Sequence, residues 1–296
     1  MQAQRIETFN KEQVRTKQMV ARLNALDNVD FRPGVAATRL FTRSGAARVT
    51  LSCGATIQAK LVVGADGRHS MIREAAGIGV KTRRYGQKAL AFAVTHSIPH
   101  DNVSTEVHRT GGPFTLVPLP DHNGLPCSAV VWMDDGPKTQ ARMAADTATL
   151  EAEATERSCS LFGPLTLASN RTLWPIISQQ AERLTAQRVA LMAEAAHVMP
   201  PIGAQGLNMS LGDMRVLLEL AEANPGDLGR AQMLEAYHRR RHLEVRARIA
   251  GIDMLNRASM LAPRPLRDLR AMGLDAIYSL APVRRTMMQL GLGARG

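Results

Sequence analysis

The residues best suited to chemistry lie in one stretch, 191–214, whose prolines and glycines could shape a backbone cradle for an anionic, planar cofactor. Pro200 and Pro201 fix the backbone and remove two N–H donors, whereas Gly203 and Gly206 permit close approaches that a Cβ would block. The loop leads into apolar residues at helical spacing, namely Leu207, Leu211, Met214, Leu217 and Leu218. The unpaired N–H groups that open such a helix stabilise negative charge, so the stretch predicts an anion-binding loop.

A second stretch, residues 60–73, predicts a strand, a tight turn and a short helix. The run Leu61-Val62-Val63 is β-rich, and Gly64-Ala65-Asp66-Gly67 has the composition of a turn. Ser70 then stands where a helix cap is expected, with Arg73 one turn later. Taken alone, these residues fit a ligand-binding turn and an ordinary strand, turn and capped helix equally well.

The first stretch resembles the flavoprotein aromatic hydroxylases of the para-hydroxybenzoate hydroxylase type. In that family Gly-Asp-Ala-Ala-His, Pro-Pro and Gly-Ala-x-Gly-Leu-Asn follow one another, and here residues 193–197, 200–201 and 203–208 read AEAAH, PP and GAQGLN. The resemblance implies that the carboxylate of Glu194 holds the ribityl chain of FAD. It further implies that the cofactor-binding loop includes Gly203, and that the isoalloxazine ring is flanked by Pro201 and the backbone of Gly206, Leu207 and Asn208.

The second stretch resembles the Gly-Ala-Asp-Gly-x-x-Ser-x-x-Arg segment of the same family. The family positions fall on Gly64, Asp66, Gly67 and Arg73. The resemblance implies that Asp66 lies near the FAD diphosphate, where the electron donor, NAD(P)H or another reductant, also approaches. Two motifs in the family's order and separation favour the cofactor interpretation of both.

The C-terminal part narrows the resemblance to the ubiquinone-biosynthesis hydroxylases, through Tyr237, Arg240-Arg241, Asp253 and the segments 255–257, 265–267 and 273–274. The resemblance implies hydroxylation of the aromatic ring of a polyprenylated phenol with O₂, an electron donor and FAD, through a flavin C4a-hydroperoxide. No catalytic acid or base is identified. His197 is the nearest candidate, and we interpret it as a structural hydrogen-bond partner.

Two features separate the chain from that family. Ala193 and Glu194 stand where the family has Gly and Asp, and the only Gly-x-Gly-x-x-Gly spacing, residues 291–296, has no helix after it. We therefore expect the isolated chain to bind FAD weakly or not at all. The sequence fits a monooxygenase whose N-terminal βαβ unit is missing from it. The alternative is a non-catalytic, FAD-poor relative that acts as a binding or scaffold protein in a quinone-synthesis complex.

The predicted fold class is α/β (α+β), an incomplete Rossmann-like FAD-binding lobe with an inserted, mainly antiparallel β substrate domain and C-terminal helices. Residues 1–84 should form the remainder of the FAD lobe, with a helix over 11–26 and strands over 38–42, 47–52 and 56–63. Residues 85–183 should form the substrate sheet, with strands over 89–96, 104–108, 114–118 and 128–133 and a helical part over 140–160. Residues 184–296 should return to the FAD lobe.

Composition limits the partners. The sequence has no apolar run long enough to span a bilayer, and its N-terminal segment is polar, which predicts a cytoplasmic protein. The formal net charge is +11, and the arginines late in the sequence could face an anionic surface at the periphery of the inner membrane. Tyr237 and Tyr278 are the only aromatic residues near these arginines, too few for a surface that stacks on bases, so a nucleic-acid partner is disfavoured. Three widely spaced cysteines predict neither a disulfide framework nor a metal site, and we interpret His238 and His242 as solvent-facing residues.

Overall fold

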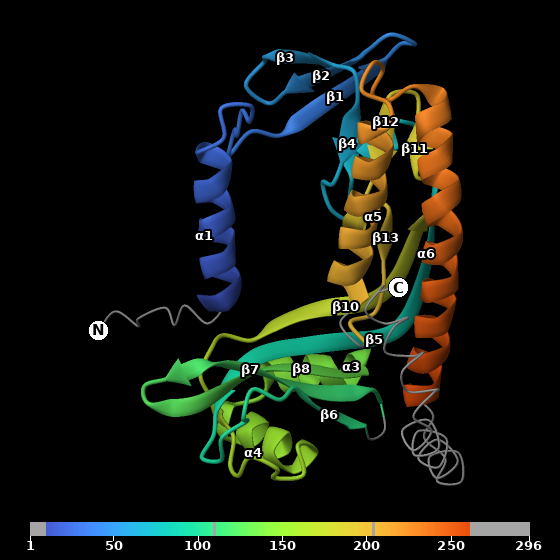
Figure 1. Ribbon diagram of the computed structural model, residues 1–296. Helices are drawn as coiled ribbons and strands as arrows, with labels where there is room; N and C mark the ends of the chain where they lie inside the picture. Colours follow the sequence, from blue (N-terminus) through green and yellow to red (C-terminus); the bar gives the residue numbers. More distant parts are fainter. Residues whose placement is uncertain (1–9, 109–110, 203–204, 261–296) are drawn as a thin grey trace. The chain divides into compact units, whose positions relative to one another are not determined.

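The computed structural model describes residues 10–108, 111–202 and 205–260 (Figure 1). The chain divides into two compact units. Unit 1 contains Met1–Pro33 and Tyr85–Ile176, and unit 2 contains Gly34–Arg84 and Ile177–Ala258. The units change between residues 84 and 85 and again between residues 176 and 177. The first helix, α1 (Asn10–Asn24), belongs to unit 1, where it contacts strand β7 (Pro113–His122).

Unit 1 is built on a mainly antiparallel sheet in which β10 (Thr172–Ala181), β5 (Val80–Thr95), β8 (Leu125–Asp135), β7 (Pro113–His122) and β6 (Thr105–His108) are neighbours in that order. The short strand β9 (Thr166–Leu167) also pairs with β5. The helices α3 (Gly136–Ala144) and α4 (Thr147–Arg157) follow β8. The mainly antiparallel character predicted for residues 85–183 is confirmed.

The two faces of this sheet differ in side-chain size. On one face Leu90, Phe92 and Trp132 form a core with Leu150 and Ala154 of α4. The opposite face carries the alternate residues, and there the β5–β8 register pairs Ala91 with Val131 and Ala93 with Ala129, while Ala89 lies across from Met133. Alternation along β5 thus produces one bulky, helix-covered face and one face of small side chains.

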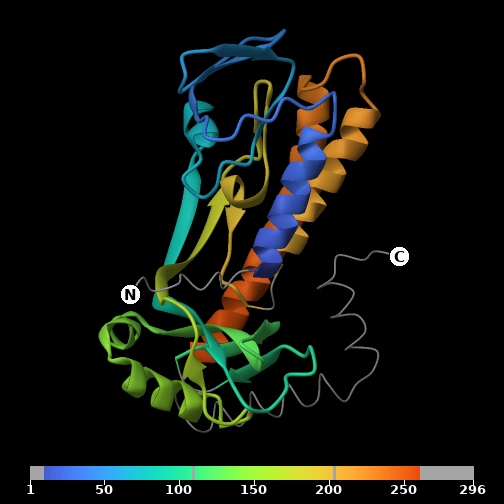
Figure 2. The same cartoon turned by 90° about the vertical axis from the view of Figure 1, so that its left-hand side faces the viewer.

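Unit 2 holds the segments predicted to bind the cofactor. A meander of β1 (Ala37–Thr42), β2 (Ala47–Leu51) and β3 (Thr56–Ala59) is followed by a second sheet in the order β11 (Thr185–Ala186), β12 (Val189–Leu191), β4 (Val62–Gly64). The short helix α2 (Met71–Ala75) follows β4. The long helices α5 (Gln205–Glu222) and α6 (Ala231–Met260) run side by side in both views (Figures 1 and 2). Val189, Leu191, Val216, Leu217 and Tyr237 are part of the buried core.

Most predicted elements are present, and the differences have local causes. The single strand predicted over 56–63 is two strands, because β3 pairs antiparallel with β2 whereas β4 pairs parallel with β12. The helical part predicted over 140–160 is two helices, because Asp146 caps α4 by accepting from the N–H of Thr149 at 2.8 Å. His238 and His242 do not simply face solvent: their half-buried rings stack with centroids 4.7 Å apart. Residues beyond 260 lie outside the described part of the chain, and they include the last of the arginines that were predicted to face a membrane.

Candidate cofactor-binding site

The two predicted cofactor motifs meet at one end of a parallel strand pair. β4 and β12 are neighbours with Gly64 opposite Leu191, and the N–H of Met192 donates to the carbonyl of Gly64 at 3.0 Å. The carboxyl ends of parallel strands lie at the same edge of a sheet, so the turn after each strand starts from the same place. Segments that are far apart in the sequence therefore open onto a common edge.

Asp66 is used locally as a helix cap. Its carboxylate accepts from the hydroxyl of Ser70 at 2.5 Å and from the N–H of Ile72 at 3.0 Å, and Ser70 in turn accepts from the N–H of Arg73 at 2.9 Å. The residue is nevertheless exposed, and Gly67 beside it has a φ of +83°, a conformation that favours glycine. The capping interpretation of this turn is confirmed, while a contact between Asp66 and a diphosphate stays a prediction.

Arg73 and Gly64 serve the packing of the protein itself. The buried guanidinium of Arg73 donates to the carbonyl of Ala195 at 2.9 Å and to that of Arg68 at 3.0 Å, so it joins the two motifs. A Cβ on Gly64 would lie 2.8 Å from Cδ2 of Leu191 and 2.9 Å from Cγ2 of Ile72. Glycine is required there by close packing between the strands and α2, whether or not a cofactor is bound.

The segment after β12 turns sharply at the position predicted to hold the ribityl chain. Ala193 has a φ of +53°, in the left-handed region that favours glycine, and it opens a short 3₁₀ helix, η1 (Ala193–Ala195). The family has glycine at this position, and the structure gives the physical reason. The carboxylate of Glu194 is exposed on this turn, where it is free to accept hydrogen bonds from a ligand.

Helix α5 begins at Gln205, two residues before the predicted start, so Gly206, Leu207 and Asn208 all lie in its first turn. The first N–H groups of a helix have no acceptor within it. A Cβ on Gly206 would meet no protein atom within 4 Å, which leaves open space beside these donors. Pro201 is exposed just before them, and Gly203 lies outside the described residues. We call the turn Ala193–Glu194 and the first turn of α5 together the flavin cradle.

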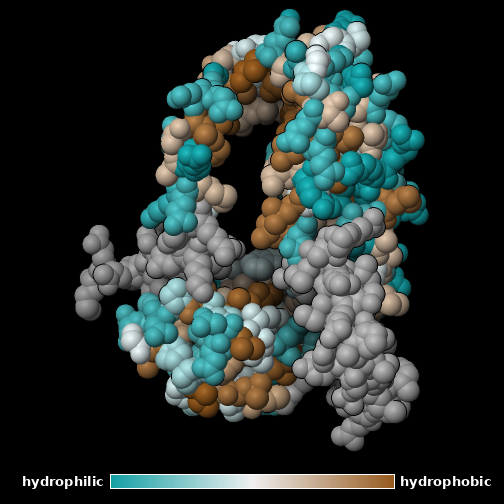
Figure 3. Space-filling model, in the orientation of Figure 1, coloured by the Kyte–Doolittle hydropathy of each residue, from teal (hydrophilic) through white to brown (hydrophobic). Residues whose placement is uncertain are grey.

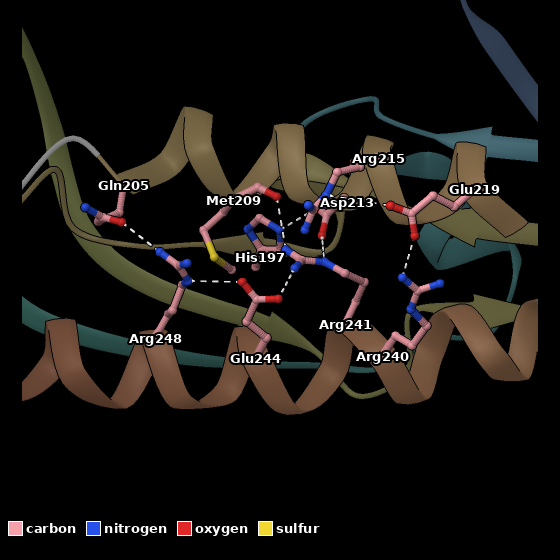
Figure 4. Close-up of polar contacts among 10 residues, drawn as sticks. All are labelled: His197, Gln205, Met209, Asp213, Arg215, Glu219, Arg240, Arg241, Glu244 and Arg248. Atoms are coloured by element: carbon pink, nitrogen blue, oxygen red, sulfur yellow. Dashed lines mark hydrogen bonds and ion pairs between the residues drawn. The ribbon is translucent and has the colours of Figure 1, made fainter. Parts of the chain in front are cut away.

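A buried carboxylate lies behind the cradle, between α5 and α6 (Figure 4). Asp213 on α5 is fully buried and accepts hydrogen bonds from three different elements. The donors are Nε2 of His197 on β13 (His197–Val198) at 2.7 Å, Nε of Arg241 on α6 at 2.8 Å and the N–H of Ala193 at 3.0 Å. The structural role predicted for His197 is confirmed, since its ring is buried and bonded to this carboxylate.

The guanidinium of Arg241 extends this cluster to the start of α5. It donates to the carbonyl of Met209 at 3.1 Å and to the carboxylate of Glu244. Glu244 also accepts from Nε of Arg248 at 3.3 Å, and Arg248 donates to Oε1 of Gln205 at 3.0 Å. A continuous chain of polar contacts thus leads from Asp213 to the first residue of α5, and Figure 4 shows its side chains pointing toward one another.

The environment of Asp213 keeps it ionised. Burial by itself raises the pKa of the carboxyl, but the hydrogen bond from His197 and the positive charges of His197 and Arg241 outweigh it, so the pKa lies below its ordinary value. An ionised carboxylate only accepts hydrogen bonds, so Nε2 of His197 carries the proton. The nearby Tyr237 donates its hydroxyl to the carbonyl of Leu191 at 2.9 Å, and burial raises the pKa of that phenol.

The buried pair of Asp213 and Arg241 was not predicted from the sequence. The available signal was an acidic residue between apolar residues of a helix, Met209 on one side and Val216 and Leu217 on the other.

The apolar residues of α5 were predicted to lie on one buried face. Only Leu217 of the five is buried, and four large apolar side chains reach the surface along α5 (Figure 3): Leu207, Leu211, Met214 and Leu218. Val216, which the predicted stripe did not include, is buried in its place.

These residues fit one half of FAD. An exposed carboxylate on the Ala193–Glu194 turn suits the hydroxyls of a ribityl chain, and the open space at Gly206 suits a flat ring held against backbone N–H groups. Two of the five N–H donors of Arg73 are bonded to carbonyl groups of the protein, and a contact between Arg73 and the cofactor stays a prediction. Within residues 10–260, apart from the four omitted positions, no group of three or more metal-ligating side chains comes together.

Comparisons with known proteins find relatives named for ubiquinone biosynthesis. Ubiquinone hydroxylase UbiL of Rhodospirillum rubrum is 33% identical over 247 residues, which cover 82% of this chain and 57% of that protein. The 3-demethoxyubiquinol 3-hydroxylase of Escherichia coli is 28% identical over 82% of this chain and 62% of its own length. The human ubiquinone biosynthesis monooxygenase COQ6 is 30% identical over 81% and 58%. The chain thus spans about three fifths of the length of these relatives.

Solved structures share the fold at lower identity. p-Nitrophenol 4-monooxygenase PnpA from Pseudomonas putida has a TM-score of 0.76 at 19% identity, over 95% of this chain and 72% of that one. The Diels-Alderase PyrE3 has a TM-score of 0.73 at 22% identity, over 95% and 59%. The family model described as FAD binding domain matches residues 18–251, more than half of the chain. This match shows that the chain belongs to the family described as FAD binding domain.

Proposed function

We propose that this chain supplies the ribityl and ring half of the FAD site in a monooxygenase of ubiquinone biosynthesis, which hydroxylates the aromatic ring of a polyprenylated phenol. The observation that carries the proposal is the meeting of both cofactor motifs at one edge of the β4–β12 pair. The names of the relatives, a ubiquinone hydroxylase, a 3-demethoxyubiquinol 3-hydroxylase and a ubiquinone biosynthesis monooxygenase, support the reaction class.

The chemistry divides between cofactor and protein. Bound FAD would receive electrons from NAD(P)H or another donor and activate O₂, so that one oxygen atom reaches the ring. In this chain Glu194 would accept hydrogen bonds from the ribityl hydroxyls, and the first turn of α5 would stabilise negative charge on the reduced ring.

Flavin titration tests the half-site. Titrations of the full chain should run to millimolar FAD or FMN with flavin fluorescence as the signal, because we expect weak binding. FMN retains the ring and the ribityl chain, so its affinity should lie within a few-fold of that of FAD. FAD that binds a hundredfold more tightly than FMN, or a purified chain that retains stoichiometric yellow flavin, would contradict this assignment.

Two matched variants test the role of Glu194. Removing the charged acceptor, Glu194→Gln, should weaken FMN binding about tenfold, because a hydrogen bond to a charged group contributes about 1.5–3 kcal/mol. Glu222→Gln makes the same change on an exposed carboxylate at the far end of α5 and should leave binding unchanged. If Glu194→Gln and Glu222→Gln bind FMN with equal affinity, Glu194 is not part of the FMN site.

The relatives favour an enzyme over the scaffold alternative, and turnover decides between them. The chain should be supplied with FAD, a chemical reductant, O₂ and a short-chain polyprenylphenol, and the product analysed by mass spectrometry for one added oxygen atom. Hydroxylated product above the level of free flavin supports the monooxygenase. Tight binding of the phenol with no product, at saturating flavin, supports the scaffold.

We also propose contact with anionic lipid through α6. Arg239 and Arg246 are exposed, no ion pair of theirs occurs among the described residues, and Leu243 and Met254 are exposed on the same helix. Other arginines of the basic segment are engaged internally, as in the Arg240–Glu219 pair at 2.5 Å. Among the described helices none combines the length and apolar character needed to cross a bilayer. Sedimentation with phosphatidylglycerol vesicles, but not with phosphatidylcholine vesicles, should depend on Arg239 and Arg246.

A further inference from the structure

We infer that Asp213 is a positioning residue that holds the two segments of the flavin cradle in register with each other. The inference rests on the proposed function in that these segments are taken to be the cradle. Asp213 itself lies about two helical turns beyond the first residue of α5, so it acts through other groups and touches no ligand.

The first segment is attached directly. Oδ2 of Asp213 accepts from the backbone N–H of Ala193 at 3.0 Å, and the same oxygen accepts from Nε2 of His197 at 2.7 Å. These two donors lie at either end of the turn that carries Glu194. The bond to Ala193 also holds a residue whose φ of +53° is unfavourable for a side chain with a Cβ.

The second segment is attached through arginines. Oδ1 of Asp213 orients the guanidinium of Arg241, which is 1% exposed and which bonds the carbonyl of Met209. From Arg241 the contacts pass through Glu244 to Arg248, and from there to the side chain of Gln205. Because α6 is a rigid helix, these contacts fix the start of α5 relative to the Ala193–Glu194 turn.

The site requires a carboxylate at position 213. Three donors, among them the guanidinium of Arg241, converge on two oxygens of a fully buried carboxylate. An asparagine of the same shape has one acceptor oxygen, and its NH₂ group would face a donor, either Arg241 or His197. Asp213→Asn should therefore free one segment or both while changing the side-chain volume very little.

The experiment compares three variants of the full chain by amide hydrogen exchange and by FMN titration. Asp213→Asn should increase exchange both at Ala193 and at residues 209–212, whose amides bond the carbonyls of the first turn of α5. Arg248→Met removes the contacts of Arg248 with Glu244 and Gln205 but leaves Arg241 bonded to Asp213, so it should increase exchange at residues 209–212 and leave Ala193 unchanged. Asp227→Asn is the matched control, since Asp227 pairs with Arg188 and contacts no member of the cradle network.

The flavin arm separates positioning from general stabilisation. At a temperature where every variant is folded by circular dichroism, Asp213→Asn should weaken FMN binding at least tenfold and change the visible circular dichroism of bound FMN, while Asp227→Asn should match the wild type. Unchanged exchange at either segment in Asp213→Asn overturns the inference, as does unchanged FMN affinity. If the wild type binds neither FMN nor FAD, the proposed function fails, and the exchange pattern of Asp213→Asn and Arg248→Met still decides whether Asp213 couples the two segments.

Discussion

The backbone N–H of Ala193, a residue held at a φ of +53°, donates to the buried carboxylate of Asp213 at 3.0 Å. A left-handed conformation costs an L-residue roughly 1–2 kcal/mol, whereas glycine adopts it freely. This bond is one of the interactions that hold an unfavourable turn at the start of the predicted ribityl site.

Ala193→Gly should therefore stabilise the chain. The relief of left-handed strain exceeds the extra backbone entropy of glycine, so we expect a gain of about 0.5–1 kcal/mol in the free energy of unfolding, measured by urea denaturation. Ala195→Gly is the control two residues later, where the buried residue has no positive φ, and it should lose about 1 kcal/mol. A loss of stability in both variants would show that the backbone of Ala193 is not strained.

Gly64→Ala should be destabilising for a reason unrelated to flavin. The added Cβ would come 2.8 Å from Leu191 and 2.9 Å from Ile72, and overpacking of this kind costs about 1–3 kcal/mol. Thermal unfolding measures the effect without any cofactor. Equal unfolding midpoints for Gly64→Ala and the wild type would show that strand and helix can separate at no cost.

Gly206→Ala should show the opposite combination. Its Cβ meets no protein atom, and alanine favours a helix by up to about 1 kcal/mol over glycine, so stability should stay level or rise. FMN affinity should fall, because the methyl group occupies the space in front of the first-turn N–H groups. A variant that is more stable than the wild type and binds FMN equally well would show that the ring does not lie beside Gly206.

The lowered pKa of Asp213 makes a prediction about acid stability. In the unfolded chain the carboxyl has its ordinary pKa of 3.8, so as the pH falls through that value the unfolded state takes up a proton before the folded state does. The stabilisation by Asp213 is complete above about pH 5 and is lost as the pH falls toward the folded pKa. The difference in unfolding free energy between the wild type and Asp213→Asn, about 3 kcal/mol or more at pH 7, should therefore shrink at pH 3. A constant difference would mean that the carboxyl is not ionised in the fold.

His238 and His242 should lower stability at mildly acidic pH. Burial and neighbouring positive charges hold the pKa of both rings below the ordinary 6.5, and Nδ1 of His238 accepts from the N–H of Leu184 at 3.3 Å. The unfolded histidines protonate first as the pH falls below 6.5, so stability is lost in that range. In His242→Gln the loss between pH 7 and pH 5, followed by urea titration, should be smaller than in the wild type.

Local patterns allowed much of the fold to be predicted. The strands of the meander, the helix over residues 11–26 and the capped turn at Asp66 follow from alternation, turn residues and a cap. Which side of α5 is buried could not be predicted, because apolar residues line more than one face of that helix. Nor could the Asp213–Arg241 pair, whose partners lie 28 positions apart on separate helices. Such a pairing depends on how α5 and α6 pack, and a single sequence contains no record of that packing.

Gly64 and Leu191 are direct neighbours in a parallel pair, although the whole sheet of unit 1 lies between them in the sequence. That sheet is thus an insertion between two adjacent strands. Residues can be exchanged, added or deleted in it without a change in the register of β4 and β12. Evolution can therefore remodel this sheet while the cofactor motifs keep their places, which gives this fold two parts that can diverge at different rates.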